Sequence, residues 1–327
     1  MQKTISVVIP CYNEIENVEP IYLAVKQELK ASLPQYNYEI LFIDNYSTDG
    51  TRNKLEELCS KDAKVKAIFN KKNFGQFSSP YYGMMQTSGD CVILMVADFQ
   101  DPVELIPRFV EEWEKGAQVV CGIKTSSKES GLVYFLRSLY YKSIKKMSTV
   151  DQIEHFTGFG LYDKSFIETM RTLKDPLPFL RGIVAEYAPD HVDIAYQQPQ
   201  RRAGKTHNNW YTLYNAAMLS FTSYTKIGLR AATLLGFVVA AISGIIGLVY
   251  LVLKLIYWDR FSAGIAPLSI GVFFFGSIQL IFIGLLGEYV LNINARVINR
   301  PLVIEEKRLN FNKNQAATCA EDDNETK

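Results

Sequence analysis

Asp98 and Gln100 are the residues of this chain whose types and position are best suited to chemistry. They follow Cys91–Val96, an unbroken apolar run typical of a central strand in a parallel sheet covered on both faces. Ligands bind open α/β sheets just outside the carboxyl ends of the strands, where these two side chains are expected. Their oxygen atoms suit Mg²⁺ or Mn²⁺ carrying phosphates. Asp98 and Asp101 could instead cap a helix beginning at Pro102, so these residues alone leave both roles open.

Short β-branched runs alternate with amphipathic stretches from residue 1 to about 125, a pattern typical of a parallel α/β sheet. The expected strands are Ile5–Ile9, Glu39–Ile43, Val65–Phe69, Cys91–Val96 and Val119–Gly122. Polar turns follow four of them, at Tyr12–Glu14, Asp44–Asn45, Asn70–Asn73 and Asp98–Asp101. Because the carboxyl ends of parallel strands meet at one edge, these four turns are expected to line one crevice.

Asp44 is the second candidate ligand contact. It directly ends a predicted strand and is expected to face the same crevice as Asp98. The residues after it, Ser47–Thr51, run into a helix, and helix capping explains them without a ligand. We therefore predict a binding role for Asp44 and a structural role for the rest of that turn.

Two basic segments are candidates for phosphate or membrane contact. Residues 131–147 predict a helix with a large apolar face and basic residues that include Arg137, which suits either a membrane interface or ordinary packing on the sheet. Tyr196–Thr206 carries Arg201, Arg202 and Lys205 around a glycine. A basic loop near an acidic sheet edge suits phosphates, although the same charges could simply be solvated.

The totals exclude several classes of protein. The chain has 327 residues and a net charge of +1, which gives no indication of a nucleic-acid partner. Its five cysteines are scattered without a CxxC pair, which argues against a disulfide framework or a zinc site. The catalytic part is therefore expected in the reducing cytoplasm.

Charge is absent from Ala231–Leu253 and from Phe261–Gly287, each long enough to cross a bilayer. The aromatic stretch Trp210–Lys226 predicts a helix at the headgroup level. Basic residues flank the pair of runs on their outer sides, so both termini are expected in the cytoplasm of a multi-pass plasma-membrane protein. The expected parts are a catalytic domain at 1–206, an amphipathic helix at 207–230, two transmembrane helices with a short external loop at 231–291, and a C-terminal segment with a disordered end at 292–327.

Taken together, the sequence resembles the family 2 glycosyltransferases of the GT-A fold that transfer a sugar to a polyprenyl phosphate, a group that includes dolichol-phosphate mannose synthases and, more closely, bactoprenol glucosyltransferases. The resemblance covers Ser6 to about Pro301 and rests on the order of several short motifs. These motifs are Val8–Glu14, Asp44–Thr51, Asn73–Gln76, Ala97–Pro102, Arg202–Lys205, Gly287–Tyr289 and Arg300–Pro301.

The resemblance implies an α/β fold with a mostly parallel sheet, followed by interface helices and two membrane spans. It implies an inverting transfer from a nucleotide sugar, such as a UDP-hexose, to undecaprenyl phosphate. The product would supply sugar for modification of a cell-envelope glycan. The resemblance also implies a homo-oligomer, specifically a tetramer. Asp98 and Gln100 would be the catalytic residues, as ligands of Mg²⁺ or Mn²⁺. The nucleotide would contact Pro10, Tyr12, Glu14, Asp44, Asn73 and Gly75, and the phosphates of donor or acceptor would contact Arg137, Arg201, Arg202 and Lys205.

Three positions depart from the family pattern. Val96 stands where an Asp-x-Asp motif has its first aspartate, Asn45 replaces a paired aspartate, and Gly158 occupies the place of the aspartate proposed as base. These departures motivate one alternative, a membrane-anchored scaffold with a degenerate transferase domain. The other alternative is a processive polysaccharide synthase, against which the chain has no Gln-x-x-Arg-Trp motif. Glu154 and His155 are further candidates to assist a base, although a phosphate acceptor needs little such help.

Overall fold

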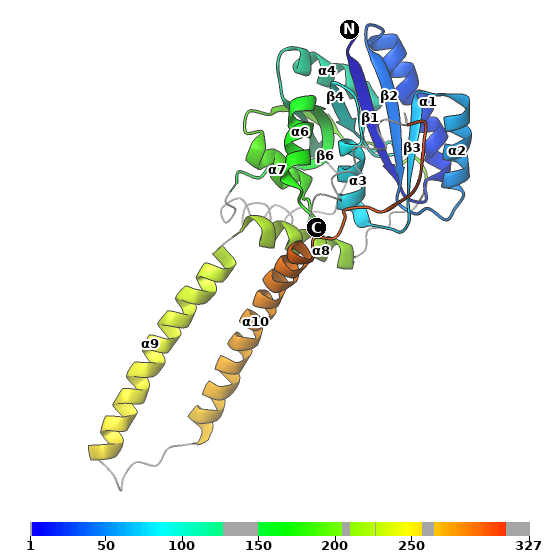
Figure 1. Cartoon of the computed structure of the whole chain (residues 1–327). Helices are drawn as coiled ribbons and strands as arrows, with labels where there is room; N and C mark the ends of the chain where they lie inside the picture. The colour runs from blue at the N-terminus through cyan, green and yellow to red at the C-terminus, as the bar shows by residue number, and fades with distance from the viewer. Residues whose placement is uncertain (1, 127–149, 205–209, 226, 257–264, 312–327) are drawn as a thin grey trace, which may run out of the picture. The chain divides into compact units, whose positions relative to one another are not determined.

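Strand β1 (Thr4–Cys11) has buried side chains on both faces, which places it in the interior of a sheet. Ile5, Val7 and Ile9 pack into one hydrophobic cluster and Val8 into another, as the two-residue period of a strand requires. The computed structural model describes residues 2–126, 150–204, 210–225, 227–256 and 265–311. Within these residues it contains an eight-stranded sheet with the order β7-β5-β6-β4-β1-β2-β3-β8 (Figure 1).

Two compact units divide the chain, and residues 299–327 belong to the same unit as the N-terminal part. The first unit contains β1 (Thr4–Cys11), α1 (Ile15–Ser32), β2 (Asn37–Asp44), α2 (Thr51–Lys61), β3 (Val65–Asn70), α3 (Gly75–Met85), β4 (Cys91–Leu94), the 3-10 helix η1 (Val103–Leu105), α4 (Ile106–Glu114), β5 (Val119–Ser126), β6 (Phe156–Asp163), α6 (Lys164–Leu173), α7 (Leu180–Tyr187), β7 (Val192–Gln197) and β8 (Glu305–Leu309). The second contains α8 (Trp210–Tyr224), α9 (Ile227–Ile256) and α10 (Ile265–Ile298).

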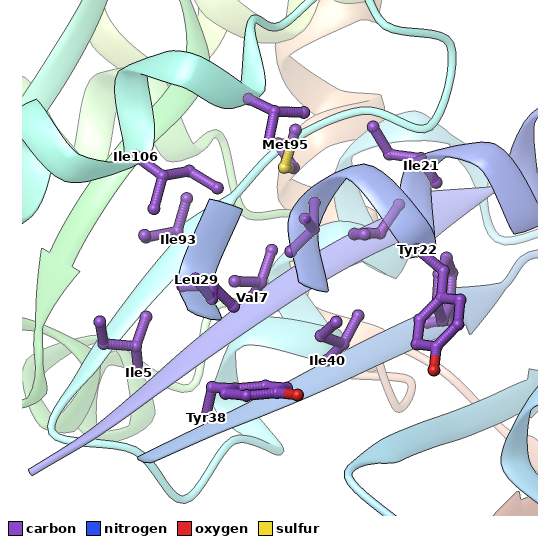
Figure 2. Close-up of a cluster of buried hydrophobic side chains, with 14 of the residues drawn as sticks. Ile5, Val7, Ile21, Tyr22, Leu29, Tyr38, Ile40, Ile93, Met95 and Ile106 are labelled. Atoms are coloured by element: carbon purple, nitrogen blue, oxygen red, sulfur yellow. The ribbon is translucent and has the colours of Figure 1, made fainter. Parts of the chain in front are cut away.

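Helices cover both faces of the sheet. Side chains of α1, α2 and α4 pack into the cluster on one face, shown in Figure 2, and side chains of α3, α6 and α7 pack into the cluster on the other. Strands β1, β2, β3 and β4 pair in parallel, whereas β6 and β8 pair antiparallel with their neighbours. These observations confirm the predicted α/β architecture with a mostly parallel sheet.

The five predicted strands are present, with one correction at the end of β4. The strand ends at Leu94, and Val96 lies outside it with 38% of its surface exposed. Instead of continuing the ladder, the Val96 backbone N–H donates to Asp101 Oδ2 at 3.0 Å. The expected helix start at Pro102 is also wrong in detail, because Pro102 precedes the short helix η1 and no side chain caps it.

Helices α8 and α10 of the second unit are joined by polar contacts. The Tyr214 hydroxyl donates to Glu288 Oε1 at 2.9 Å, the Tyr289 hydroxyl donates to the Thr225 carbonyl at 2.6 Å, and Asn292 Nδ2 donates to Thr222 Oγ1 at 2.7 Å. Glu288 therefore has a specific partner on α8.

One helix of the described residues, Phe274–Ile298 within α10, is long and apolar enough to cross a membrane, whereas two were expected. Ala232–Ser243 within α9 is a shorter apolar helix by the same measure.

A buried ion pair stabilises the sheet at the opposite end from the polar turns. Glu39 on β2 and Lys66 on β3 form a salt bridge of 2.5 Å with 8% and 13% of their side chains exposed. Burial favours a higher pKa for the Glu39 carboxyl, but hydrogen bonds from Lys66, Ser6 and the Ser88 N–H hold that pKa below its ordinary value. The carboxylate is therefore charged and fully bonded in the folded protein.

Replacing Lys66 by methionine is expected to lower the free energy of unfolding by about 3 kcal/mol, because Glu39 would remain buried without its cation. Thermal unfolding in detergent measures this effect. Lys115→Met is the control, since its salt bridge to Glu111 is on the surface, and it should change stability by less than about 0.5 kcal/mol. Equal melting temperatures for Lys66→Met and the wild type would contradict a structural role for the pair.

Candidate functional site

The turns after β1 and β2 are tied together at the carboxyl edge of the sheet. Cys11 pairs with Asp44 in register, and the Asn45 N–H donates to the Cys11 carbonyl at 2.9 Å. The Asn13 N–H donates to Ser47 Oγ at 2.8 Å, and Asn13 Oδ1 accepts from the Thr48 N–H at 2.8 Å. These hydrogen bonds join the two turns into one wall of the site.

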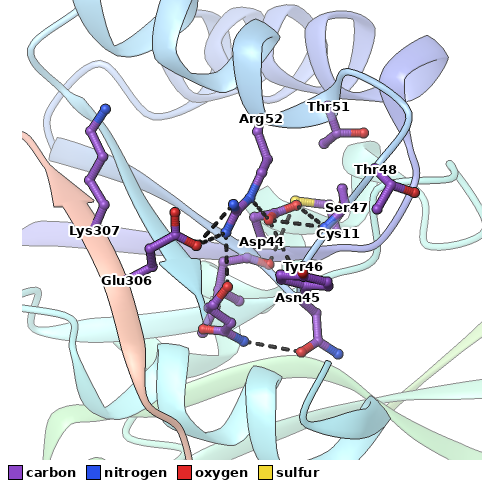
Figure 3. A network of polar contacts seen from close by, with 12 residues as sticks. Cys11, Asp44, Asn45, Tyr46, Ser47, Thr48, Thr51, Arg52, Glu306 and Lys307 are labelled. Carbon is purple, nitrogen blue, oxygen red and sulfur yellow. Dashed lines mark hydrogen bonds and ion pairs between the residues drawn. The ribbon is translucent and has the colours of Figure 1, made fainter. Parts of the chain in front are cut away.

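Asp44 lies at the centre of this wall with no exposed surface. Its carboxylate accepts hydrogen bonds from the backbone N–H groups of Tyr46 and Ser47, and Arg52 Nε donates to its Oδ2 at 2.9 Å (Figure 3). Arg52 also donates to the Asn70 carbonyl at 2.8 Å. Arg52 could not be identified from the sequence, where it is one of several basic residues of an amphipathic helix, but in the structure it supports this turn.

Asn45 fixes the loop between β3 and α3, which contains Asn73 and Gly75. Its Nδ2 donates to Asn73 Oδ1 at 3.0 Å and to the Gly75 carbonyl at 3.1 Å. Its Oδ1 accepts from Asn70 Nδ2 at 3.1 Å and from the Phe74 N–H at 2.9 Å. Gly75 has a positive φ of 87°, which favours glycine at the start of α3. The structure therefore brings the predicted residues Asn73 and Gly75 to the same edge as Asp44.

Asn45→Asp is expected to lower the free energy of unfolding by about 2 to 4 kcal/mol, because a carboxylate would face two acceptors, Asn73 Oδ1 and the Gly75 carbonyl, where an amide now donates. Thermal unfolding in detergent tests this. Asn37→Asp, at an exposed position beside Lys64, provides the matched control and should leave the melting temperature within about 2 °C. An Asn45→Asp variant as stable as the control would show that the amide donors are unimportant.

The loop that follows β4 places Asp98 beneath a second loop, the basic loop 201–204. Asp98 is 8% exposed, and its Oδ1 accepts from the Gln100 N–H at 3.1 Å. The Arg202 N–H donates to the Asp98 carbonyl at 3.2 Å, and the Arg202 guanidinium lies 5.0 Å from the centroid of the Phe99 ring. The structure thus brings together Asp98, Gln100 and Arg202.

Arg201 lies between the carboxylates of Asp98 and Glu14. Its Nε is 3.4 Å from Asp98 Oδ2, and its Nη2 contacts Glu14 Oε1. Asn17 Nδ2 bonds both Glu14 Oε2 at 2.5 Å and the Ala203 carbonyl at 3.2 Å, which holds the basic loop against the start of α1. Asn17, which the sequence did not single out, is therefore a further residue of the site.

Electrostatics differ between the acidic groups of this site. Burial raises the pKa of Glu14, and hydrogen bonds and charge from Asn17 and Arg201 partly oppose the rise. Burial raises the pKa of Asp101 to about 7, against hydrogen bonds from the Val96 N–H and the Tyr196 hydroxyl. Asp101 therefore supports the loop that contains Asp98, through its hydrogen bonds to the Val96 N–H and the Tyr196 hydroxyl.

The oxygen donors of Asp98 and Gln100 fit a hard divalent cation such as Mg²⁺ or Mn²⁺. Asp98 Oδ2 lies close to the Arg201 guanidinium, so the negative charge of this carboxylate is already stabilised by a positive charge. Cys121, His191 and Asp193 form a separate group whose ligand atoms lie within 4.8 Å of one another. That group shares no residue with the site around Asp98. Its thiol and imidazole ligands suit softer metals than Mg²⁺ or Mn²⁺.

Gly158 has a φ of +103°, a backbone conformation that side-chain-bearing residues rarely adopt. The Tyr162 hydroxyl donates to its carbonyl at 2.6 Å, which fixes this stretch of β6. An aspartate at this position would be strained, which gives a structural reason for glycine here. The adjacent Glu154 and His155 lie just before β6, and His155 also has a positive φ, of 58°.

The remaining predicted residues are placed as follows. Pro10 lies in β1, paired in register with Ile43, and Tyr12 directly follows β1 at the strand-end edge; both are half-buried. Arg137, together with the expected helix at 131–147, and Lys205 lie outside the described residues.

Three comparisons relate this chain to known proteins. The family model described as "Glycosyl transferase family 2" matches residues 6–171. The SfII prophage-derived bactoprenol glucosyl transferase of Shigella flexneri is 32% identical over 306 residues, covering 93% of this chain and 97% of the relative. The prophage bactoprenol glucosyl transferase homolog of Escherichia coli strain K12 is 31% identical, covering 92% and 97%. The glucosyl-3-phosphoglycerate synthase of Mycobacterium tuberculosis, solved with Mn²⁺, UDP-glucose and phosphoglyceric acid, is 16% identical with a TM-score of 0.45, covering 67% of this chain and 79% of that one.

Proposed function

Since the chain belongs to glycosyl transferase family 2, we propose that it transfers a monosaccharide from a nucleotide sugar to a polyprenyl phosphate. The observation that carries this proposal is the basic loop 201–204 lying on the acidic strand end, with Arg201 between Glu14 and Asp98. Such a site offers carboxylates for a metal and guanidinium groups for phosphates in one place. Relatives named as bactoprenol glucosyl transferases, matched over nearly their whole length, support the lipid acceptor.

The residues of the site suit a direct displacement that inverts the anomeric configuration. Asp98 and Gln100 would hold a divalent cation, which would stabilise the charge that develops on the departing nucleoside diphosphate. Arg201 and Arg202 would bind phosphate oxygens and orient the acceptor in line with the sugar. A phosphate monoester has a second pKa of about 6 and is already ionised at neutral pH. The transfer therefore needs no aspartate at Gly158.

The nucleoside would lie against the wall formed by the turns after β1, β2 and β3, a UDP-hexose being the expected donor. Pro10 lies in β1, and Tyr12 and Glu14 follow that strand. Asp44 is the last residue of β2, and Asn73 and Gly75 lie between β3 and the start of α3. Asp44 would act by holding the turn in shape, because its carboxylate is buried and bonded within the protein.

Two membrane spans, with the catalytic unit on the cytoplasmic face, are the arrangement we propose. The segment of the second unit that contains α8, α9 and α10, residues 210–298, is preceded and followed by residues of the first unit, and β8 of the first unit pairs with β3. Because both connections end in the same folded unit, the chain between them must cross the bilayer an even number of times. A span in α10 therefore requires a second crossing, for which α9 is the available helix. Assembly as a tetramer stays a prediction.

The test is to incubate the detergent-purified protein with Mg²⁺ or Mn²⁺, undecaprenyl phosphate and a panel of nucleotide sugars, and to analyse the lipid fraction by mass spectrometry. We expect one hexose per lipid phosphate with one donor of the panel. Chains of sugar would indicate a processive synthase, and no product with any donor would favour a scaffold. With a productive donor, proton NMR of the product would contradict the proposed displacement if the donor's anomeric configuration is retained.

A further inference from the structure

Tyr46 has a backbone conformation that a tyrosine rarely adopts. Its φ is +73°, in the left-handed region where a residue with a bulky side chain is strained. Tyr46 is nevertheless 44% exposed, and it lies two residues after the end of β2, where the ligand is expected. Strain of this kind persists where the surrounding structure enforces it, and it is concentrated at ligand sites. Packing alone does not explain a large aromatic residue here.

Arg52 supports the Tyr46 ring. The centre of its guanidinium lies 5.6 Å from the centroid of the Tyr46 ring and 5.4 Å from that of the Phe69 ring. The guanidinium is fixed by its bonds to Asp44 and to the Asn70 carbonyl. A cation held beside an aromatic ring at this distance attracts the ring electrostatically and limits its rotation.

Glu306 on β8 completes the support from the far end of the chain. Arg52 Nη1 donates to Glu306 Oε2 at 3.0 Å, as Figure 3 shows. Strand β8 is itself secured, because the Lys71 N–H donates to the Ile304 carbonyl at 2.9 Å and Tyr82 donates to Glu305 Oε1 at 2.9 Å. Arg52 therefore connects the C-terminal strand to the end of β2.

We propose that Tyr46 stacks on the nucleobase of the sugar nucleotide, and that Arg52 and Glu306 are positioning residues that hold its ring in place. The inference rests on the proposed function, because it requires a nucleotide donor. Aromatic rings stack on any base, so Tyr46 would supply affinity, and discrimination between bases would come from hydrogen-bonding groups of the neighbouring turns. No part of the resemblance assigned a role to Tyr46 or to β8.

Calorimetric titration of the full-length protein in detergent with UDP, GDP and inorganic pyrophosphate, each with Mn²⁺, tests the stacking. We expect Tyr46→Gly and Tyr46→Leu to bind the preferred nucleoside diphosphate about tenfold more weakly and pyrophosphate as the wild type does. Tyr46→Phe, which keeps the ring, should bind within about twofold of the wild type. Glycine relieves the strained φ but gains freedom in the unfolded chain, so the melting temperature should change by no more than about 2 °C.

Glu306→Gln tests the positioning role and should weaken nucleoside diphosphate binding about threefold without affecting pyrophosphate. Its matched control is Lys307→Gln, which removes the neighbouring contact of β8 to Glu56 without touching Arg52 and should leave binding unchanged. A wild type that binds neither UDP nor GDP would refute a UDP-sugar or GDP-sugar as the donor, and stacking of Tyr46 on its base with it. A wild type that binds one, with Tyr46→Gly and Tyr46→Leu binding it equally well, would overturn the stacking and leave the proposed function standing. Equal losses in Glu306→Gln and Lys307→Gln would overturn the positioning role.

Discussion

Replacing Asp98 by alanine is expected to lower the rate of sugar transfer by at least about a thousandfold. Asp98 lies in the loop that follows β4, where it is buried beneath the basic loop and accepts a hydrogen bond from the Gln100 N–H. Without it, the cation on the donor diphosphate would lose its charged ligand, and stabilisation of the leaving group is worth several kcal/mol. The initial rate of lipid-linked sugar formation, measured at saturating donor, gives this effect.

Folding must be monitored in the same variant, because Asp98 also faces Arg201. The melting temperature of Asp98→Ala should stay within a few degrees of the wild type, since Arg201 keeps its contact with Glu14. Asp190→Asn, at an exposed position before β7, is the control for removing one carboxylate and should retain full activity. Normal transfer by a folded Asp98→Ala protein would refute its assignment.

Arg201→Gln is expected to reduce transfer roughly a hundredfold and to move the acid limb of the pH profile to higher pH. The expected fall in rate follows from the proposed function, in which the Arg201 guanidinium binds phosphate oxygens. The pH effect follows from Glu14, whose pKa is raised by burial and partly lowered again by Asn17 and Arg201. Without Arg201 the opposing effect weakens, so Glu14 keeps its proton to a higher pH and the ionised form that the site uses is lost earlier as pH falls.

Rates across a series of pH values, for the wild type, Arg201→Gln and Arg201→Lys, separate these two effects. Arg201→Lys keeps a positive charge but not the paired donors, so it should shift the acid limb less than Arg201→Gln does. A variant with a reduced rate and an unchanged acid limb would show that Arg201 does not act on Glu14. An unchanged rate would remove Arg201 from the phosphate site.

The sheet could be predicted from the sequence where hydrophobic runs have the period of a strand. Strands β1, β2, β3 and β5 lie where their apolar residues indicated, because both faces of the sheet are buried. Strand β8 could not be found this way, since its sequence Glu-Glu-Lys-Arg-Leu carries four charges and no apolar alternation. It forms because its partners on β3, α2 and α3 supply complementary charges and backbone bonds. Such tertiary contacts override local propensity.

The site could be predicted in its location but not in its internal bonding. Residue types and strand ends were sufficient to place Asp98 and Arg202 at one edge. Asn45 was interpreted as a lost aspartate, whereas its amide N–H groups donate two hydrogen bonds that a carboxylate could not make, to Asn73 Oδ1 and to the Gly75 carbonyl. Arg52 and Asn17 were missed because each contacts a residue far along the chain, Glu306 and Ala203 respectively, which local sequence spacing does not reveal.

The stoichiometry of the reaction tests the central claim most directly. Released nucleoside diphosphate and lipid-linked hexose are measured in the same samples, with and without undecaprenyl phosphate, using the wild type and Asp98→Ala. We predict that the wild type releases one nucleoside diphosphate for each lipid-linked hexose, only when the lipid phosphate is present, and that Asp98→Ala forms neither product at a measurable rate. Release without the lipid phosphate, or release that exceeds the lipid-linked sugar formed, would contradict transfer to a polyprenyl phosphate.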